Sequence, residues 1–186
     1  MVAKQQIIDF LREAHINSWP DNIAPVDKPG LYGFEETHFS RGAWDFYDLY
    51  GGRVTDIGFE AIYFEKQPVW GAAYRGGVLS DEVDVTDIFD FLIAALRAPN
   101  DSEFPLRGPA VYRLDDDSQW LYQYQLSGDF FSFIGIEQIL FDQGIVYERA
   151  LIGGKFGSGL YGPAVPLFGE FLNGWKKADQ ENGGAL

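Results

Sequence analysis

Cysteine is absent from this chain of 186 residues, and histidine occurs only at His15 and His38. The absence of cysteine excludes disulfides, thiolate nucleophiles and cysteine-ligated metal sites. The two histidines belong to no HExxH or comparable ligand spacing, so no zinc site is predicted. We therefore expect neither a metal nor another cofactor.

Long apolar runs are also missing, since no stretch approaches the roughly 18 uninterrupted residues of a membrane span. The opening MVAKQQIIDFLREA lacks the apolar region and cleavage site of a signal peptide, which predicts a cytoplasmic location. Positive charge is scarce, because 14 Lys and Arg face 28 Asp and Glu and the net charge is −14. Nucleic acids and anionic membranes attract proteins through Lys and Arg, so neither is an expected direct partner. The acidity fits solubility, and it also fits a basic protein partner.

Aromatic residues, by contrast, are abundant at 17% of the chain, and hydrophobic residues reach 46%. This composition is typical of a globular protein. With no Ser-, Gly- or Pro-rich linker in its middle, we expect one domain over residues 1–186.

The sequence resembles itself at an offset of 77 residues. Residues 47–77 align with 124–154 without a gap, and 12 of the 31 pairs are identical. In each stretch aromatic and β-branched residues predict three strands, and the turns EKQP and FDQG predict hairpins. The expected strands are 43–50, 56–65, 68–75, 119–126, 130–141 and 145–151.

Three segments share the helical spacing of apolar residues: IDFLREA at 8–14, FDFLIAA at 89–95 and, more weakly, GEFLNGW at 169–175. The predicted fold is α+β: a helix plus a three-stranded antiparallel meander, internally duplicated about a pseudo-twofold axis, with a C-terminal helix. The halves would span about 5–80 and 85–156, and the last helix about 164–178. One sheet, two sheets and a barrel all remain open.

A repeated acid is the unusual feature of both stretches. Strand alternation places Glu60 on one face with Gly58, Ile62 and Phe64, and Glu137 stands in the same pattern of Gly, Ile and Phe. Glutamate is rarely buried without a partner. Either the two glutamates meet as a paired-carboxylate site, or each anchors its own half by accepting backbone N–H bonds or pairing with an arginine.

Aromatic side chains offer a second candidate for a binding site. They are Trp44, Phe46, Trp70 and Tyr74 in the first stretch, and Trp120, Tyr122 and Tyr147 in the second. Such residues line pockets, but at strand spacing they also build cores. The predicted ligand-binding set is Glu60, Glu137, Trp70, Tyr147, Trp44 and Tyr74.

The order of the segments FLREA, GAWDFYDLYGG, GFEAIYFEKQPVWGAAYRGGVL, RGPAVY and SGDFFSFIGIEQILFDQGIVYE resembles an uncharacterised bacterial family catalogued as a domain of unknown function. The resemblance covers about residues 7–155 and implies no known activity. Members of that family stand alone or follow a helix-turn-helix regulator. No such segment precedes residue 7, so no DNA-reading role is expected here.

We expect a non-enzymatic, cytoplasmic binding module that holds a small molecule or a protein in an aromatic, Glu-containing cleft between its halves. A hydrolase using Glu60 and Glu137 is the first alternative. An acidic inhibitor or immunity-like protein that binds a basic partner is the second. Ligand identity and oligomeric state stay open.

Overall fold

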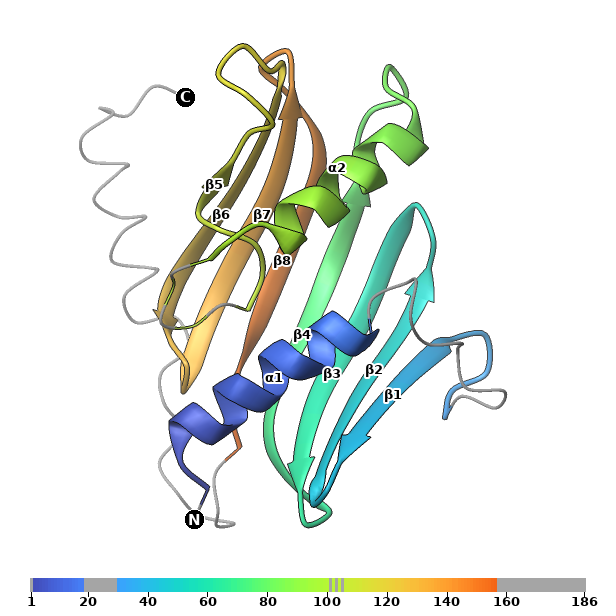
Figure 1. Cartoon of the computed structure of the whole chain (residues 1–186). Coiled ribbons are helices and arrows are strands. Elements are labelled where there is room, and N and C mark those ends of the chain that lie inside the picture. Colours follow the sequence, from blue (N-terminus) through green and yellow to red (C-terminus); the bar gives the residue numbers. More distant parts are fainter. Residues whose placement is uncertain (1, 19–29, 101, 103, 105, 157–186) are drawn as a thin grey trace, which may run out of the picture.

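A computed structural model describes residues 2–18, 30–100, 102, 104 and 106–156. The described residues form two helices and a single antiparallel sheet of eight strands in the order β1-β2-β3-β4-β8-β7-β6-β5 (Figure 1). In chain order the elements are α1 (Lys4–Ser18), β1 (Glu35–Arg41), β2 (Trp44–Gly52), β3 (Thr55–Phe64), β4 (Gln67–Val78), α2 (Val85–Arg97), β5 (Val111–Tyr112), β6 (Trp120–Asp129), β7 (Ser132–Phe141) and β8 (Gly144–Lys155).

The predicted fold class is wrong. The protein is predominantly β, and it is not built from two copies of a helix plus a three-stranded meander, because β4 pairs with β8 and joins all eight strands into one sheet. The six expected strands fall within or close to β2–β4 and β6–β8, but β1 and β5 were missed. The β1 sequence EETHFSR is too polar to read as a strand, although it buries Thr37. The helix expected at 164–178 lies outside the described residues.

Both described helices lie on the same face of the sheet (Figure 1). Helix α1 buries an apolar stripe on this side, and α2 does the same with Ile88, Phe91, Leu92 and Ala95. The side chain of Asp84 caps α2 by accepting a 2.7 Å bond from the backbone N–H of Thr86. Alternate residues of the central strands complete one continuous core beneath both helices. Neither helix in the described part of the chain is long and apolar enough to cross a membrane.

The β3–β4 and β7–β8 hairpins each turn through two residues. Glu65 and Lys66 have φ of 49° and 63°, and Asp142 and Gln143 have φ of 47° and 71°. Positive φ at both positions of a two-residue loop matches the right-handed twist of the flanking strands. The turns expected from EKQP and FDQG therefore form, without glycine at either central position.

The opposite face of the sheet carries an apolar strip over its middle strands. Ile57 and Phe59 of β3 are 53% and 42% exposed, and Ile136 of β7 is 36% exposed. Together with Ala73 and Ile152 they line a shallow groove of about 670 Å³. The surface of this groove is almost wholly apolar, and Arg75 is the one charged residue in its described lining.

Candidate functional site

Strand alternation turns both repeated glutamates toward the helices. Glu60 of β3 is 4% exposed and Glu137 of β7 is fully buried. Each therefore needs a partner from the elements that cover the sheet, and the two partners are different.

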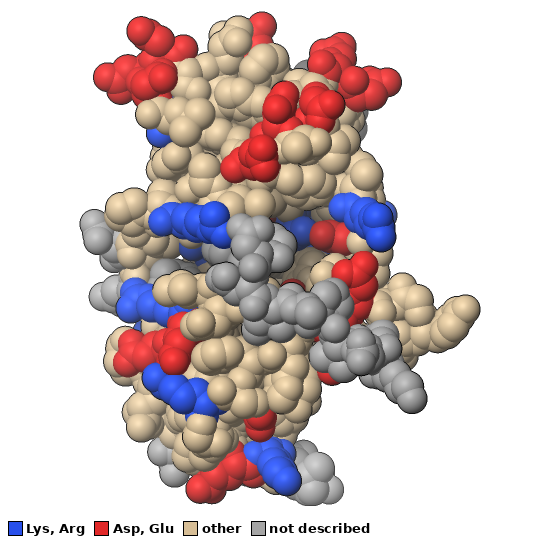
Figure 2. Space-filling view, turned by 45° about the vertical axis from the view of Figure 1, so that its right-hand side comes forward, with Lys and Arg blue, Asp and Glu red and all other residues tan. Residues whose placement is uncertain are grey.

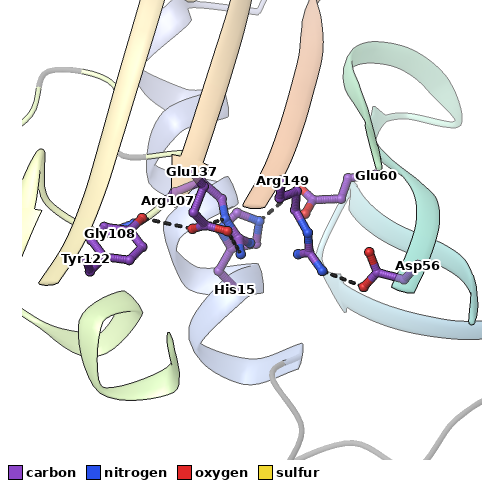
Figure 3. A network of polar contacts seen from close by, with 8 residues as sticks. All are labelled: His15, Asp56, Glu60, Arg107, Gly108, Tyr122, Glu137 and Arg149. Atoms are coloured by element: carbon purple, nitrogen blue, oxygen red, sulfur yellow. Dashed lines mark hydrogen bonds and ion pairs between the residues drawn. The ribbon is translucent and has the colours of Figure 1, made fainter. Parts of the chain in front are cut away.

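Glu137 is held by Arg107, which lies in the connection after α2 (Figure 3). Arg107 donates from Nε to Oε1 at 3.0 Å and from Nη2 to Oε2 at 2.9 Å, and the Tyr122 hydroxyl donates to Oε1 at 2.8 Å. The same hydroxyl accepts from the backbone N–H of Gly108 at 3.1 Å. Burial would raise the pKa of Glu137, but the charge and hydrogen bonds of Arg107 outweigh it and hold the pKa below its usual value. Both carboxylate oxygens are thus occupied.

Glu60 is held instead by α1. His15 Nε2 lies 3.1 Å from Glu60 Oε2, and both side chains are buried. Burial raises the pKa of Glu60, yet the attraction and hydrogen bond of His15 keep it lowered overall. Glu60 thus joins α1 to the sheet, and Glu137 joins the connection after α2 to the sheet. Only Glu137 pairs with an arginine, and the histidine partner of Glu60 was not among the expected partners.

A third ion pair crosses the middle of the sheet. Arg149 of β8 pairs with Asp56 of β3 (Figure 3). Its guanidinium lies 4.8 Å from the ring centre of Tyr74 and 5.7 Å from that of Tyr147. It reaches across Gly76, where an added Cβ would lie 2.8 Å from the Arg149 Cβ. The pKa of Asp56 is raised, because burial outweighs the attraction to Arg149.

Asp48 of β2 is the acid that the sequence did not single out. It stands opposite Glu60 on β3 and Thr37 on β1, so the three side chains form a row on the helix-facing side. The Tyr74 hydroxyl donates to Asp48 Oδ1 at 2.8 Å, and Oδ2 has no partner among the described residues. Burial, followed by the charge of Glu60, raises the pKa of Asp48 to about 7.

Two glycines make room for tyrosine rings on this face. A Cβ on Gly58 would lie 2.3 Å from the ring and hydroxyl of Tyr74. A Cβ on Gly135 would lie 2.8 Å from the hydroxyl of Tyr124. Because Gly58 has no side chain, the Tyr74 side chain can lie across β3 and reach Asp48. In each copy of the Gly-x-Glu pattern, the glycine therefore leaves room for a tyrosine ring and the glutamate two residues later is buried.

A pocket of about 450 Å³ opens between the two helices above this row. Its apolar wall is α2, through Phe89, Leu92, Ile93 and Leu96. Its polar lining is Ser18, Glu35, Thr37, Asp48, Tyr50, Asp56, Glu60, Tyr74, Arg107 and Arg149. Three buried polar atoms of these residues have no hydrogen-bond partner in the described part of the chain: Thr37 Oγ1, Arg149 Nε and Asp56 Oδ1.

Of the predicted ligand-binding residues, Glu60 and Tyr74 line this pocket, whereas Glu137, Trp70, Tyr147 and Trp44 do not. Trp70 and Tyr147 are fully buried, and Trp70 stacks against Phe130 and Phe133. Trp44 packs against Phe10 and Phe64. The structure therefore places these three aromatic side chains in the packed layer between sheet and helices.

Asp48 was missed because the ungapped alignment slips by one residue in its first strand. Glu60 faces Asp48, whereas Glu137 faces Tyr124, so Asp48 occupies the place of Tyr124 and not that of Gln125. Trp44 and Trp120 confirm this correspondence, since each ring lies 4.8 Å from the ring of the phenylalanine that ends the next strand. The identical pair Tyr47 and Tyr124 is misleading, because only Tyr124 faces the helices.

Within residues 2–18, 30–100, 102, 104 and 106–156, no group of three or more His, Asp or Glu side chains is arranged to hold a metal ion. Comparison with curated proteins and with solved structures finds no match. A family model described as "Domain of unknown function (DUF5680)" matches residues 48–156, which include β3, β4 and β6–β8 and most of the pocket's polar residues. This match covers more than half of the sequence, and the chain therefore belongs to the domain of unknown function DUF5680 family.

Proposed function

We propose that this protein is a non-enzymatic, cytoplasmic binding module that takes a small molecule into the pocket between α1 and α2. The observation that carries the proposal is the set of three unpartnered buried atoms in the lining, Thr37 Oγ1, Arg149 Nε and Asp56 Oδ1. A buried polar group without a hydrogen bond costs roughly 1–3 kcal/mol. A ligand that supplies the missing partners recovers this free energy on binding.

The surrounding ion pairs support a preformed site. Glu137 with Arg107, Glu60 with His15 and Asp56 with Arg149 tie the connection after α2, α1 and β8 to neighbouring elements. Side chains fixed in this way lose little conformational entropy when a ligand arrives, which favours binding. In contrast, the groove on the opposite face is lined almost wholly by apolar residues, with Arg75 the one charged residue among the described lining.

The resembling bacterial family includes chains that follow helix-turn-helix regulators, and this association fits a sensor role. By analogy we propose that ligand occupancy of the pocket is the signal that such a module reads. For this chain the sensor role rests on that resemblance, and the binding role rests on the pocket itself.

The test is a ligand screen by thermal shift, followed by calorimetry with the full chain. A bound compound should raise the melting temperature, and Thr37→Val should weaken its affinity about tenfold, because the variant cannot exchange a hydrogen bond with the ligand. Thr55→Val is the matched control, since Thr55 is exposed at the start of β3. If no compound binds, or if every hit binds Thr37→Val as tightly as the unchanged protein, the proposal is wrong.

A hydrolase is the second candidate, and one observation favours it. Asp48 and Glu60 are neighbouring carboxyls whose pKa values shift in opposite directions, upward for Asp48 and downward for Glu60. Such a pair can supply a proton donor and a base at neutral pH. The pair first considered, Glu60 with Glu137, is less suitable because Arg107 and Tyr122 occupy both oxygens of Glu137. Turnover of an ester or glycoside that Asp48→Asn abolishes would establish the enzyme.

A basic protein partner is the remaining alternative. Figure 2 shows Asp and Glu side chains gathered at the upper end of the molecule, the end that carries the β7–β8 turn in Figure 1. A basic partner would dock at that end, away from the pocket. Its binding should weaken strongly with added salt, whereas binding within the pocket should change little.

A further inference from the structure

We infer that the ligand of this pocket is an organic amine, with its protonated nitrogen beside Asp48 and an apolar body against α2. This inference rests on the proposed function, because it names the class of molecule that the same pocket receives.

The first support is the balance of charge in the lining. Four carboxylates line the pocket, Glu35, Asp48, Asp56 and Glu60, against the guanidinium groups of Arg107 and Arg149. Arg107 is engaged by Glu137, Arg149 by Asp56, and Glu60 by His15.

Asp48 and Glu35 are the two carboxylates of the lining that have no charged partner among these ion pairs. In the described part of the chain their hydrogen bonds come from neutral phenols only, Tyr74 to Asp48 at 2.8 Å and Tyr50 to Glu35 at 2.9 Å. Neither carboxylate forms a salt bridge with a described cation. A cation from outside the chain is the complementary ligand for two such carboxylates.

The second support is the arrangement of acceptors around Asp48. Thr37 stands opposite Asp48 in the β1–β2 register, and its buried Oγ1 has no described partner. An ammonium group carries several N–H donors, so it can bond Asp48 Oδ2 and Thr37 Oγ1 together. The last residue of α1, Ser18, also lines the pocket, and the carbonyl end of a helix favours positive charge.

The third support is the rest of the lining, which is apolar and aromatic. Phe89, Leu92, Ile93 and Leu96 form one wall, and the Tyr50 and Tyr74 rings stand beside the acids. Aromatic faces attract ammonium groups, and a volume of about 450 Å³ suits a small organic molecule rather than a bare ion. An anionic ligand would instead meet two carboxylates that form no salt bridge with a described cation.

The experiment is a thermal-shift and calorimetry series on the full chain with matched compounds. Each aliphatic or aromatic amine of the series is compared with the alcohol and the carboxylate that share its carbon skeleton. We expect the amines to bind at least tenfold more tightly than either counterpart. Asp48→Asn should reduce the affinity for amines at least tenfold, and Glu35→Gln, at the other carboxylate without a described cation, provides a second variant. Asp116→Asn, in an exposed turn, is the matched control.

The outcomes separate the two proposals. If alcohols or carboxylates bind as well as the amines, or if both acid variants bind amines unchanged, the amine inference is overturned while the pocket keeps its binding role. If no compound of any class binds, the binding function itself is overturned.

Discussion

Asp48 combines partial burial with a charged neighbour, and its titration should be visible in the stability of the protein. Its pKa is raised from 3.8 to about 7, so the folded state holds a proton that the unfolded chain releases at lower pH. Between these two values the folded state binds more protons, and the contribution of this group to stability therefore falls as the pH rises. Above about pH 7 the ionised Asp48 opposes folding.

Replacing Asp48 with Asn should accordingly stabilise the protein at about pH 8, by roughly 1–3 kcal/mol, and have a much smaller effect near pH 5. Urea unfolding at both pH values measures the difference. Asp116→Asn controls for the loss of one surface charge. A stability difference that does not change with pH would contradict the raised pKa.

Glu137 should behave in the opposite way, because its charge is matched by that of Arg107. Glu137→Gln leaves the buried guanidinium without its bidentate carboxylate, and we expect a loss of about 3–5 kcal/mol in the free energy of unfolding. The double variant Arg107→Met with Glu137→Met removes both charges and should be less destabilising than Glu137→Gln alone. Chemical denaturation measures the free energy of unfolding of both variants. A double variant less stable than Glu137→Gln would contradict the expected cost of an unpaired buried Arg107.

At the scale of the secondary-structure elements, Gly58 of β3 leaves the space through which Tyr74 of β4 reaches Asp48 of β2. An alanine there would place its Cβ 2.3 Å from the Tyr74 ring, which would have to leave β3 and release its bond to Asp48. We expect Gly58→Ala to cost about 1–3 kcal/mol, the range for overpacking, and to weaken binding in the pocket. Gly144→Ala is the control, since its added Cβ would meet only a carbonyl oxygen at 3.5 Å. Equal melting temperatures for the two variants would disprove the close packing.

Strand register explains why the sequence did not point to Asp48. The repeated Gly-x-Glu-x-Ile-x-Phe strands β3 and β7 were aligned correctly, because their hairpin partners pair with equivalent registers. The preceding strands, β2 and β6, were aligned with an error of one residue, because the β2–β3 and β6–β7 registers differ by one residue. A shift of one residue exchanges the faces of a strand, so the ungapped alignment matches Asp48 with Gln125 and not with Tyr124, the residue opposite Glu137.

At the scale of the whole molecule, one core extends beneath both helices and all the central strands. Buried residues from α1, α2 and strands β2–β4 and β6–β8 belong to a single cluster, and nine residue pairs join β4 to β8. We therefore expect one cooperative unfolding transition, with coincident midpoints by far-UV circular dichroism and by intrinsic fluorescence. Two separate transitions would show that the two sides of the sheet unfold independently.

The sequence by itself determined the elements whose pattern is local. Alternation and turn chemistry within a few residues predict strands β2–β4 and β6–β8 and their hairpin turns. They also predict the burial of Glu60 and Glu137. Only the tertiary structure decided that β4 pairs with β8, that a polar β1 adds to the edge, and that each glutamate meets a partner from far along the chain. These contacts depend on register and on the packing of helices over the sheet, which no local pattern encodes. For the same reason the pocket, with Asp48 in its lining, became visible only in the folded chain.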